Sequence, residues 1–123
     1  MIIGIGIDLI EVEKIEKSIQ SEVYLRKVFT EQEIAGSRSV LHCAESFAGK
    51  FVAKEAFMKA IGKGIRQEVW FTQIEVLRHE NMQTYIQASG EARNSLVDLN
   101  VKTIHVSITY TQRHAAAVVI LEQ

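Results

Sequence analysis

AESFAGKFVAKEAFMKAI, residues 44–61, is the longest run in the chain without a helix breaker apart from Gly49. It is rich in alanine and straight-chain residues, which predicts a long helix. On a helical projection one arc of this segment is apolar, made by Phe47, Phe51, Met58 and Ile61. We therefore expect this arc to face the core and the other elements to pack around this helix.

Two charged residues of this helix lie against its apolar arc. Glu55 projects between Phe51 and Val52, and Lys54 lies just inside the other edge. An ion held against apolar surface needs a partner, a metal or a ligand. Lys59 follows Glu55 by four residues, the spacing of an intrahelical salt bridge, so a salt bridge and a ligand site both remain open.

The first ten residues, MIIGIGIDLI, alternate in the way that is typical of a strand. The odd positions from Ile3 to Leu9 are large and apolar, which predicts that they form the packed face. The even positions carry Gly4, Gly6 and Asp8. Glycine in a strand often marks close approach by a backbone or a ligand. Either Asp8 therefore projects into open space, or the glycines let a neighbouring element pack and Asp8 only ends the strand.

The remaining segments are predicted to be short helices and two hairpins. Thr30 and Glu33 form a capping-box pattern that begins a helix ending near Ile34, before a loose segment at residues 36–39. Ser89 is a candidate helix cap. Further helices are predicted at residues 11–20 and 91–99, and strands at residues 69–77, 84–88, 102–111 and 115–122.

Composition sets the class of protein. The length of 123 residues predicts one domain, 1–123, and the net charge of −1 gives no reason to expect nucleic acid as a partner. The apolar N-terminus reaches an aspartate at position 8 and has no basic lead, so we expect neither a signal peptide nor a membrane span. The single cysteine, Cys43, fits a reducing compartment, and its spacing from the histidines does not suggest zinc.

The penultimate predicted strand places polar side chains on one face: His105, Ser107, Thr109 and Thr111. Three hydroxyls beside an imidazole can bind phosphate. The same row is common on the solvated side of an antiparallel sheet. The pattern leaves both interpretations open.

Taken together, four motifs resemble the holo-acyl-carrier-protein synthase family over essentially the whole chain. They are Gly4-Ile5-Gly6-Ile7-Asp8-Leu9, Phe29-Thr30 followed by Glu33, Phe51-Val52-Ala53-Lys54-Glu55-Ala56 running to Lys59-Ala60-Ile61-Gly62, and His105-Val106-Ser107-Ile108-Thr109. The resemblance implies an α+β fold, with an antiparallel sheet packed against one long helix and short helices. It also implies a cytoplasmic homotrimer with active sites between subunits.

The resemblance further implies a 4'-phosphopantetheinyl transferase, for which fatty acid biosynthesis is the expected setting, although the sequence leaves open whether the carrier belongs to fatty-acid or secondary metabolism. Such an enzyme moves the phosphopantetheine arm of coenzyme A onto a serine of an acyl carrier protein and releases adenosine 3',5'-bisphosphate. Asp8 and Glu55 match the family's Mg²⁺ ligands, and paired carboxylates suit this hard cation. Glu55 and Lys59 are the implied catalytic residues. The implied coenzyme A contacts are Lys50, Lys54, Gly62, Lys63, Gly64, His105, Ser107 and Thr109.

Two positions depart from the family pattern. Asn81-Met82-Gln83-Thr84 stands where the family usually has Asn-Gly-Lys-Pro, and Tyr110 stands in place of a second histidine. They motivate an alternative hypothesis, a catalytically weakened paralogue that serves as a binding or assembly subunit. An acidic carrier protein would need a local basic cluster, for which the candidates are Lys14, Lys17, Arg26 and Lys27.

Overall fold

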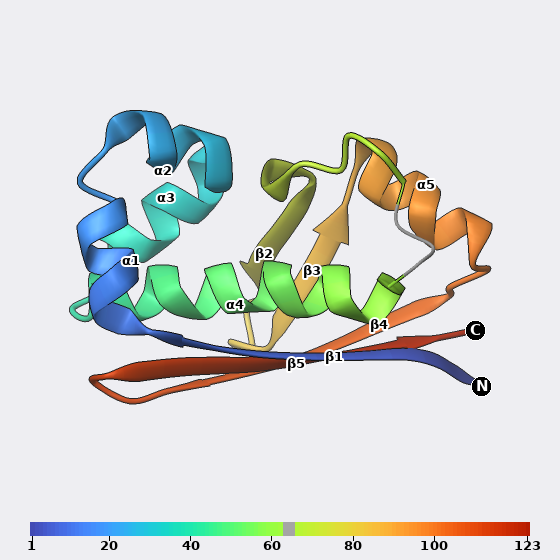
Figure 1. Ribbon diagram of the computed structural model, residues 1–123. Helices are drawn as coiled ribbons and strands as arrows, with labels where there is room; N and C mark the ends of the chain where they lie inside the picture. Colours follow the sequence, from blue (N-terminus) through green and yellow to red (C-terminus); the bar gives the residue numbers. More distant parts are fainter. Residues whose placement is uncertain (63–65) are drawn as a thin grey trace.

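The long helix α4 (Cys43–Ile61) crosses the middle of the computed structural model, which describes residues 1–62 and 66–123. One face of a sheet lies against α4 (Figure 1). The N-terminal half of α4 is covered by three short helices: α1 (Val12–Ser18), α2 (Glu22–Val28) and α3 (Glu31–Arg38). A β-hairpin and α5 (Gly90–Asp98) lie toward the C-terminal half of α4. The predicted long helix is confirmed to within one residue.

The main sheet has the order β1-β5-β4 and is antiparallel throughout, built from β1 (Ile2–Glu11), β5 (His114–Glu122) and β4 (Thr103–Tyr110). Strands β2 (Ile74–Arg78) and β3 (Thr84–Ala88) form a separate antiparallel hairpin. Both predicted hairpins are therefore present, and the architecture is the expected α+β arrangement.

Helix α4 buries more of its surface than one arc. Phe47 and Ile61 of the predicted arc are buried, whereas Phe51 and Met58 are only partly so. Phe57 and Ala48, outside that arc, are fully buried. The prediction was too narrow because α4 packs against the main sheet, α1, α3 and β2 on different sides. None of the described helices is long and apolar enough to cross a membrane.

The packed face of β1 is the opposite of the one predicted. Ile5, Ile7 and Leu9 are 62%, 67% and 66% exposed. A Cβ atom on Gly4 would overlap the carbonyl oxygen of Ala60, and one on Gly6 would overlap that of Ala56. The glycines therefore let the backbone of β1 lie directly on α4, and the isoleucine face points away from the core.

A buried ion pair joins α4 to α3 and β2. Lys54 and Glu33 are both fully buried, and their Nζ and Oε1 atoms lie 2.7 Å apart. Lys54 also donates to the carbonyl oxygens of Phe71 and Ile74, while Glu33 accepts from the backbone N–H groups of Thr30 and Val76. All three ammonium donors are used, which offsets the cost of burying the charge.

Local signals account for several element boundaries. The Thr30–Glu33 capping box is confirmed, but α3 continues through Arg38, where a loose segment was expected. Helix α2, capped by Ser21, was not predicted. Residues Phe71–Gln73 form a short 3₁₀ helix, η2, so β2 begins later than expected. Ser89 precedes α5 without capping it by its side chain.

The contact between β1 and α4 can be tested with Gly6→Ala. The added Cβ would meet backbone atoms of Ala56 and Ala60, which cannot move without shifting α4. Overpacking of this kind typically costs about 1–3 kcal/mol. We expect a thermal unfolding midpoint several degrees below wild type at equal protein concentration.

Gly36→Ala is the matched control, because the Cβ there would meet only the flexible Nζ atom of Lys50, at 3.3 Å. Alanine is also the better helix former. If Gly6→Ala proved as stable as Gly36→Ala, the close contact of β1 with α4 would be wrong.

Candidate active site

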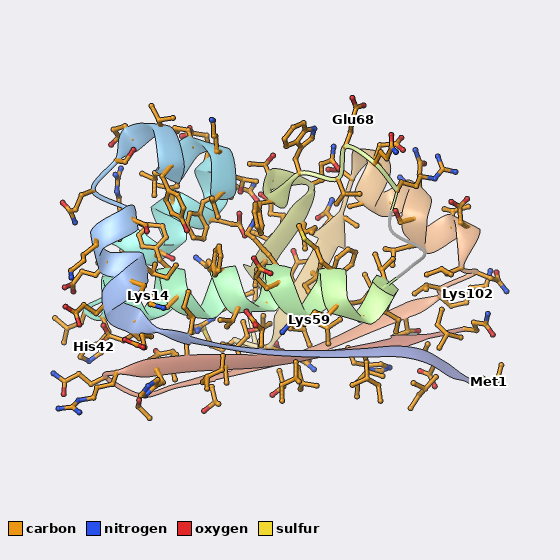
Figure 2. All side chains as sticks on the ribbon, viewed as in Figure 1. Met1, Lys14, His42, Lys59, Glu68 and Lys102 are labelled. Atoms are coloured by element: carbon orange, nitrogen blue, oxygen red, sulfur yellow. The ribbon has the colours of Figure 1, made fainter. Side chains whose placement is uncertain are left out.

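The glycine face of β1 brings Asp8 next to Lys59 of α4. The Lys59 ammonium donates to Asp8 Oδ1 at 2.9 Å and to the Ile7 carbonyl oxygen at 3.0 Å. Figure 2 shows the labelled Lys59 between α4 and β1. Of the two interpretations left open by the sequence, the intrahelical salt bridge between Glu55 and Lys59 is not formed in the described residues, because the ion pair that Lys59 makes within 4.0 Å is with the strand carboxylate.

Glu55 is half-buried beside the same pair. Burial raises the pKa of its carboxyl above the ordinary value, the negative charge of Asp8 raises it further, and Lys59 lowers it. Burial, followed by the charge of Glu55, also raises the pKa of Tyr24 on α2. Two carboxylates and one ammonium thus form a cluster between β1 and α4, which we call the carboxylate cluster: Asp8, Glu55 and Lys59.

The carboxylate cluster suits a hard cation. The mutual repulsion of Asp8 and Glu55 would be relieved by a cation between them, and Lys59 already supplies a positive charge at Asp8. Mg²⁺ commonly takes one or two protein carboxylates and keeps several waters. Within residues 1–62 and 66–123 no group of three or more potential metal-ligating side chains exists. Any Mg²⁺ here would therefore depend on water or substrate oxygens for its other ligands.

The polar row of β4 lies elsewhere in the same chain. His105, Ser107 and Thr109 pair across β5 with Ile120, Val118 and Ala116, which pair in turn with Ile5, Ile7 and Leu9. These side chains share the sheet face opposite α4. His105 Nε2 lies 2.9 Å from Glu122 Oε1. One chain thus does not bring this row to the carboxylate cluster.

The remaining expected coenzyme A residues differ in their surroundings. The structure does not support a ligand-binding role for Lys54, because its three donors are used inside the core. Gly62 ends α4 with a φ of 61° and has open space where a Cβ would lie. Lys63 and Gly64 fall outside the described residues.

Lys50 lines a cavity of about 460 Å³ between α4, the β2–β3 hairpin and the end of β4. Met82, Thr84 and Tyr110 also line this cavity, so both departures from the family pattern meet in one place. Arg78, at the end of β2, lines it too and was missed. The only sequence signal for Arg78 was a basic residue just before the turn at residues 79–83.

The predicted basic cluster is partly neutralised. Lys17 pairs with Glu13 at 3.2 Å, and Arg26 contacts both Glu22 and Glu31. For Lys14 and Lys27 the described residues provide no salt bridge within 4.0 Å. The net positive charge available to an acidic partner therefore comes mainly from Lys14 and Lys27.

Comparison with known proteins places this arrangement in a family. Residues 4–119 match the 4'-phosphopantetheinyl transferase superfamily, and the chain belongs to that family. It is 39% identical to a holo-[acyl-carrier-protein] synthase from Koribacter versatilis, with 99% of each chain covered.

Solved structures of synthases from this family have the same fold as this chain. A holo-(acyl-carrier-protein) synthase from Bacillus anthracis, in complex with CoA (3',5'-ADP), is 34% identical, with a TM-score of 0.80 over 98% of this chain and 96% of that one. The synthase from Neisseria meningitidis, at 24% identity, has a TM-score of 0.89 with 100% of both chains covered, which shows the fold alone.

The raised pKa of Glu55 predicts how stability depends on pH. Because ionised Glu55 is disfavoured in the folded chain, its contribution to stability is fully present below about pH 4.5 and is lost as the pH rises through the folded pKa. Glu55→Gln should therefore raise the unfolding midpoint at pH 7, and the difference from wild type should vanish at acid pH.

Glu16→Gln, which removes an exposed carboxylate of α1, is the matched control and should show no such pH-dependent gain. An unchanged midpoint for Glu55→Gln at pH 7 would mean that Glu55 is not strained by burial and by Asp8.

Proposed function

We propose that this chain transfers the 4'-phosphopantetheine arm of coenzyme A to a serine of an acyl carrier protein and releases adenosine 3',5'-bisphosphate. The observation that carries the proposal is the carboxylate cluster, in a chain that matches holo-acyl-carrier-protein synthases over its full length. Transfer of a phosphoryl-linked group from a pyrophosphate requires groups that neutralise the negative charge of its phosphates. Two carboxylates that can hold a cation, together with one ammonium, meet this requirement.

In this reaction the serine oxygen bonds to the β-phosphorus of coenzyme A while the bond from that phosphorus to the oxygen bridging it to the nucleotide phosphate breaks. Asp8 and Glu55 would hold Mg²⁺, which supplies neutralisation of the pyrophosphate charge. Glu55, whose pKa is raised, accepts the serine proton directly or through water. Lys59, 55% exposed at its side chain, is free to turn from Asp8 toward the leaving phosphate.

We propose that the chain is a homotrimer with active sites between subunits. Three observations support it: the sheet face that carries Ile5, Ile7 and Leu9 is exposed, the polar row of β4 lies on that face, and the carboxylate cluster lies on the other. Association through the apolar half of this face would cover it and would place one chain's polar row near another chain's cluster.

The alternative of a weakened paralogue is not favoured, because the curated relatives that match over the full length are named as synthases. We further propose that the carrier belongs to fatty acid biosynthesis and that the chain works in the cytoplasm. The free thiol of Cys43 is consistent with a reducing compartment.

The transfer is tested by incubating the protein with coenzyme A, Mg²⁺ and an apo acyl carrier protein and weighing the carrier. We expect a gain of one phosphopantetheine group, at least a hundredfold slower for Asp8→Ala or Glu55→Gln because each loses a metal-binding carboxylate. Mg²⁺ should also raise the unfolding midpoint of wild type more than that of Glu55→Gln.

A competent synthase serves as the positive control. Absence of any mass gain, with that control active on the same carrier, would reject the transferase and favour the weakened paralogue. Full turnover by Glu55→Gln would reject the proposed role of Glu55.

The trimer is tested by light scattering after gel filtration of wild type and Ile7→Lys. Placing a charge in the centre of the apolar face should dissociate the trimer and reduce transfer together with it. Val97→Lys is the matched control, because Val97 on α5 is 68% exposed and lies away from the sheet. A wild-type monomer with full activity would contradict the shared site.

A further inference from the structure

A hydrogen-bonded chain of three side chains joins α3 to α4. Lys50 Nζ lies 2.7 Å from Ser37 Oγ, and Ser37 Oγ lies 2.8 Å from Ser46 Oγ. Ser37 on α3 is fully buried, whereas Ser46 and Lys50 on α4 line the same cavity. A hydroxyl in a cavity is thus connected through a buried hydroxyl to an amine. We call these three residues the serine–lysine relay: Ser46, Ser37 and Lys50.

The amine of the relay can lose its proton close to neutral pH. Burial lowers the pKa of Lys50 to about 8; the charge of Glu33 opposes this shift, and the charges of Arg78 and Lys54 add to it. In slightly alkaline solution much of the protein therefore carries Lys50 as a neutral amine, which has a lone pair and can accept a proton.

The hydrogen bonds of the relay can run in either direction. When Lys50 is charged, it donates to the Glu33 backbone carbonyl at 2.9 Å and to Ser37 Oγ. When it is neutral, one N–H still donates to that carbonyl, and the lone pair can accept the Ser37 proton. Either hydroxyl can donate between Ser37 and Ser46. A proton can therefore pass from Ser46 through Ser37 to Lys50, which activates the Ser46 oxygen as a nucleophile.

The cavity beside Ser46 suits a short acyl group. Its volume of about 460 Å³ lies within the range of small-molecule sites, and Val76 and Ile108 provide apolar wall for a hydrocarbon chain. Arg78 lines the cavity as well. Attack on a carbonyl carbon creates a negatively charged oxygen, which a guanidinium in the same cavity can stabilise.

We propose that Ser46 is a nucleophile that accepts a short acyl group from a thioester or another activated ester, with Ser37 and Lys50 as its proton relay. This activity goes beyond the proposed transfer from coenzyme A and does not involve the carboxylate cluster.

The reaction balances in two stages. Ser46 Oγ bonds to the carbonyl carbon while its proton passes to Ser37 and the Ser37 proton passes to Lys50. The bond from that carbon to the leaving sulfur or oxygen then breaks, and the proton held by Lys50 passes to the leaving group or to water. The product is an ester of Ser46. Water hydrolyses this ester by the same steps and releases the carboxylic acid.

The test uses p-nitrophenyl butyrate and S-butyryl-N-acetylcysteamine, a thioester that carries no nucleotide. The protein is incubated with each compound at about pH 8, where Lys50 is partly neutral, then quenched in acid and weighed. We expect a gain of one butyryl group, which peptide mass spectrometry locates on Ser46. Release of p-nitrophenol should begin with a burst equal to the protein concentration, as for other acyl-enzymes.

Variants separate the roles of the three residues. Ser46→Ala should abolish the burst. Ser37→Ala and Lys50→Arg should slow acylation roughly a hundredfold, as expected for loss of a general base. Arginine keeps the donors of Lys50 but cannot accept a proton. Wild-type acylation should accelerate as the pH rises through about 8 and then level off, and Lys50→Arg should lack this inflection, which a purely structural lysine would not produce.

Ser39→Ala is the matched control, because Ser39 lines the same cavity but donates its hydroxyl to the Gly36 carbonyl at 2.8 Å, outside the relay. It should be acylated like wild type. The unfolding midpoint of each variant is measured alongside. Absence of acylation in wild type, acylation that maps to Lys50, or an unchanged burst in Ser46→Ala would overturn the inference.

The outcomes are distinct from those of the transfer assay. An active transferase that is never acylated at Ser46 would reject only the relay. A chain that transfers nothing but is acylated at Ser46 would keep the relay and reject the transferase.

Discussion

The structure depends on the direct contact between the backbones of β1 and α4. No side chain separates them at Gly4 and Gly6, so the strand lies against the helix carbonyls of Ala60 and Ala56. This contact places Asp8 of the strand within hydrogen-bond reach of Lys59 on the helix. A protein with side chains at these glycines would hold the two elements further apart and would separate the charges.

Two neighbouring charged residues of α4, Lys54 and Glu55, have different roles. Lys54 is neutralised inside the core by Glu33, where it links α4 to α3 and β2. Its neighbour Glu55 projects in a different direction, toward β1, where burial and Asp8 hold its pKa above the usual range. Adjacent positions on a helix project about 100° apart, so one residue binds the fold together and the next remains available for chemistry.

In the proposed trimer, association between chains would bring together the two halves of the proposed site. The carboxylate cluster lies between β1 and α4, whereas His105, Ser107 and Thr109 lie on the other face of the sheet. The apolar half of that face, made by Ile5, Ile7 and Leu9, is exposed in the single chain. Lys50 lies apart from both, in the cavity between α4, the β2–β3 hairpin and the end of β4. A ligand as long as coenzyme A can reach between such regions when they come from neighbouring chains.

The sequence by itself determined the long helix, the hairpins and the capping box at Thr30, because periodicity and turn chemistry are local properties. It singled out Asp8, Glu55 and Lys59 as candidate site residues through the family resemblance that the order of the motifs carries. Only the tertiary structure decided which face of β1 packs, that Lys59 pairs with Asp8 rather than Glu55, and that Lys54 is buried. Alternation in a strand marks two faces but does not say which one a helix will cover, and an ion has no identifiable partner until distant segments are brought together by packing.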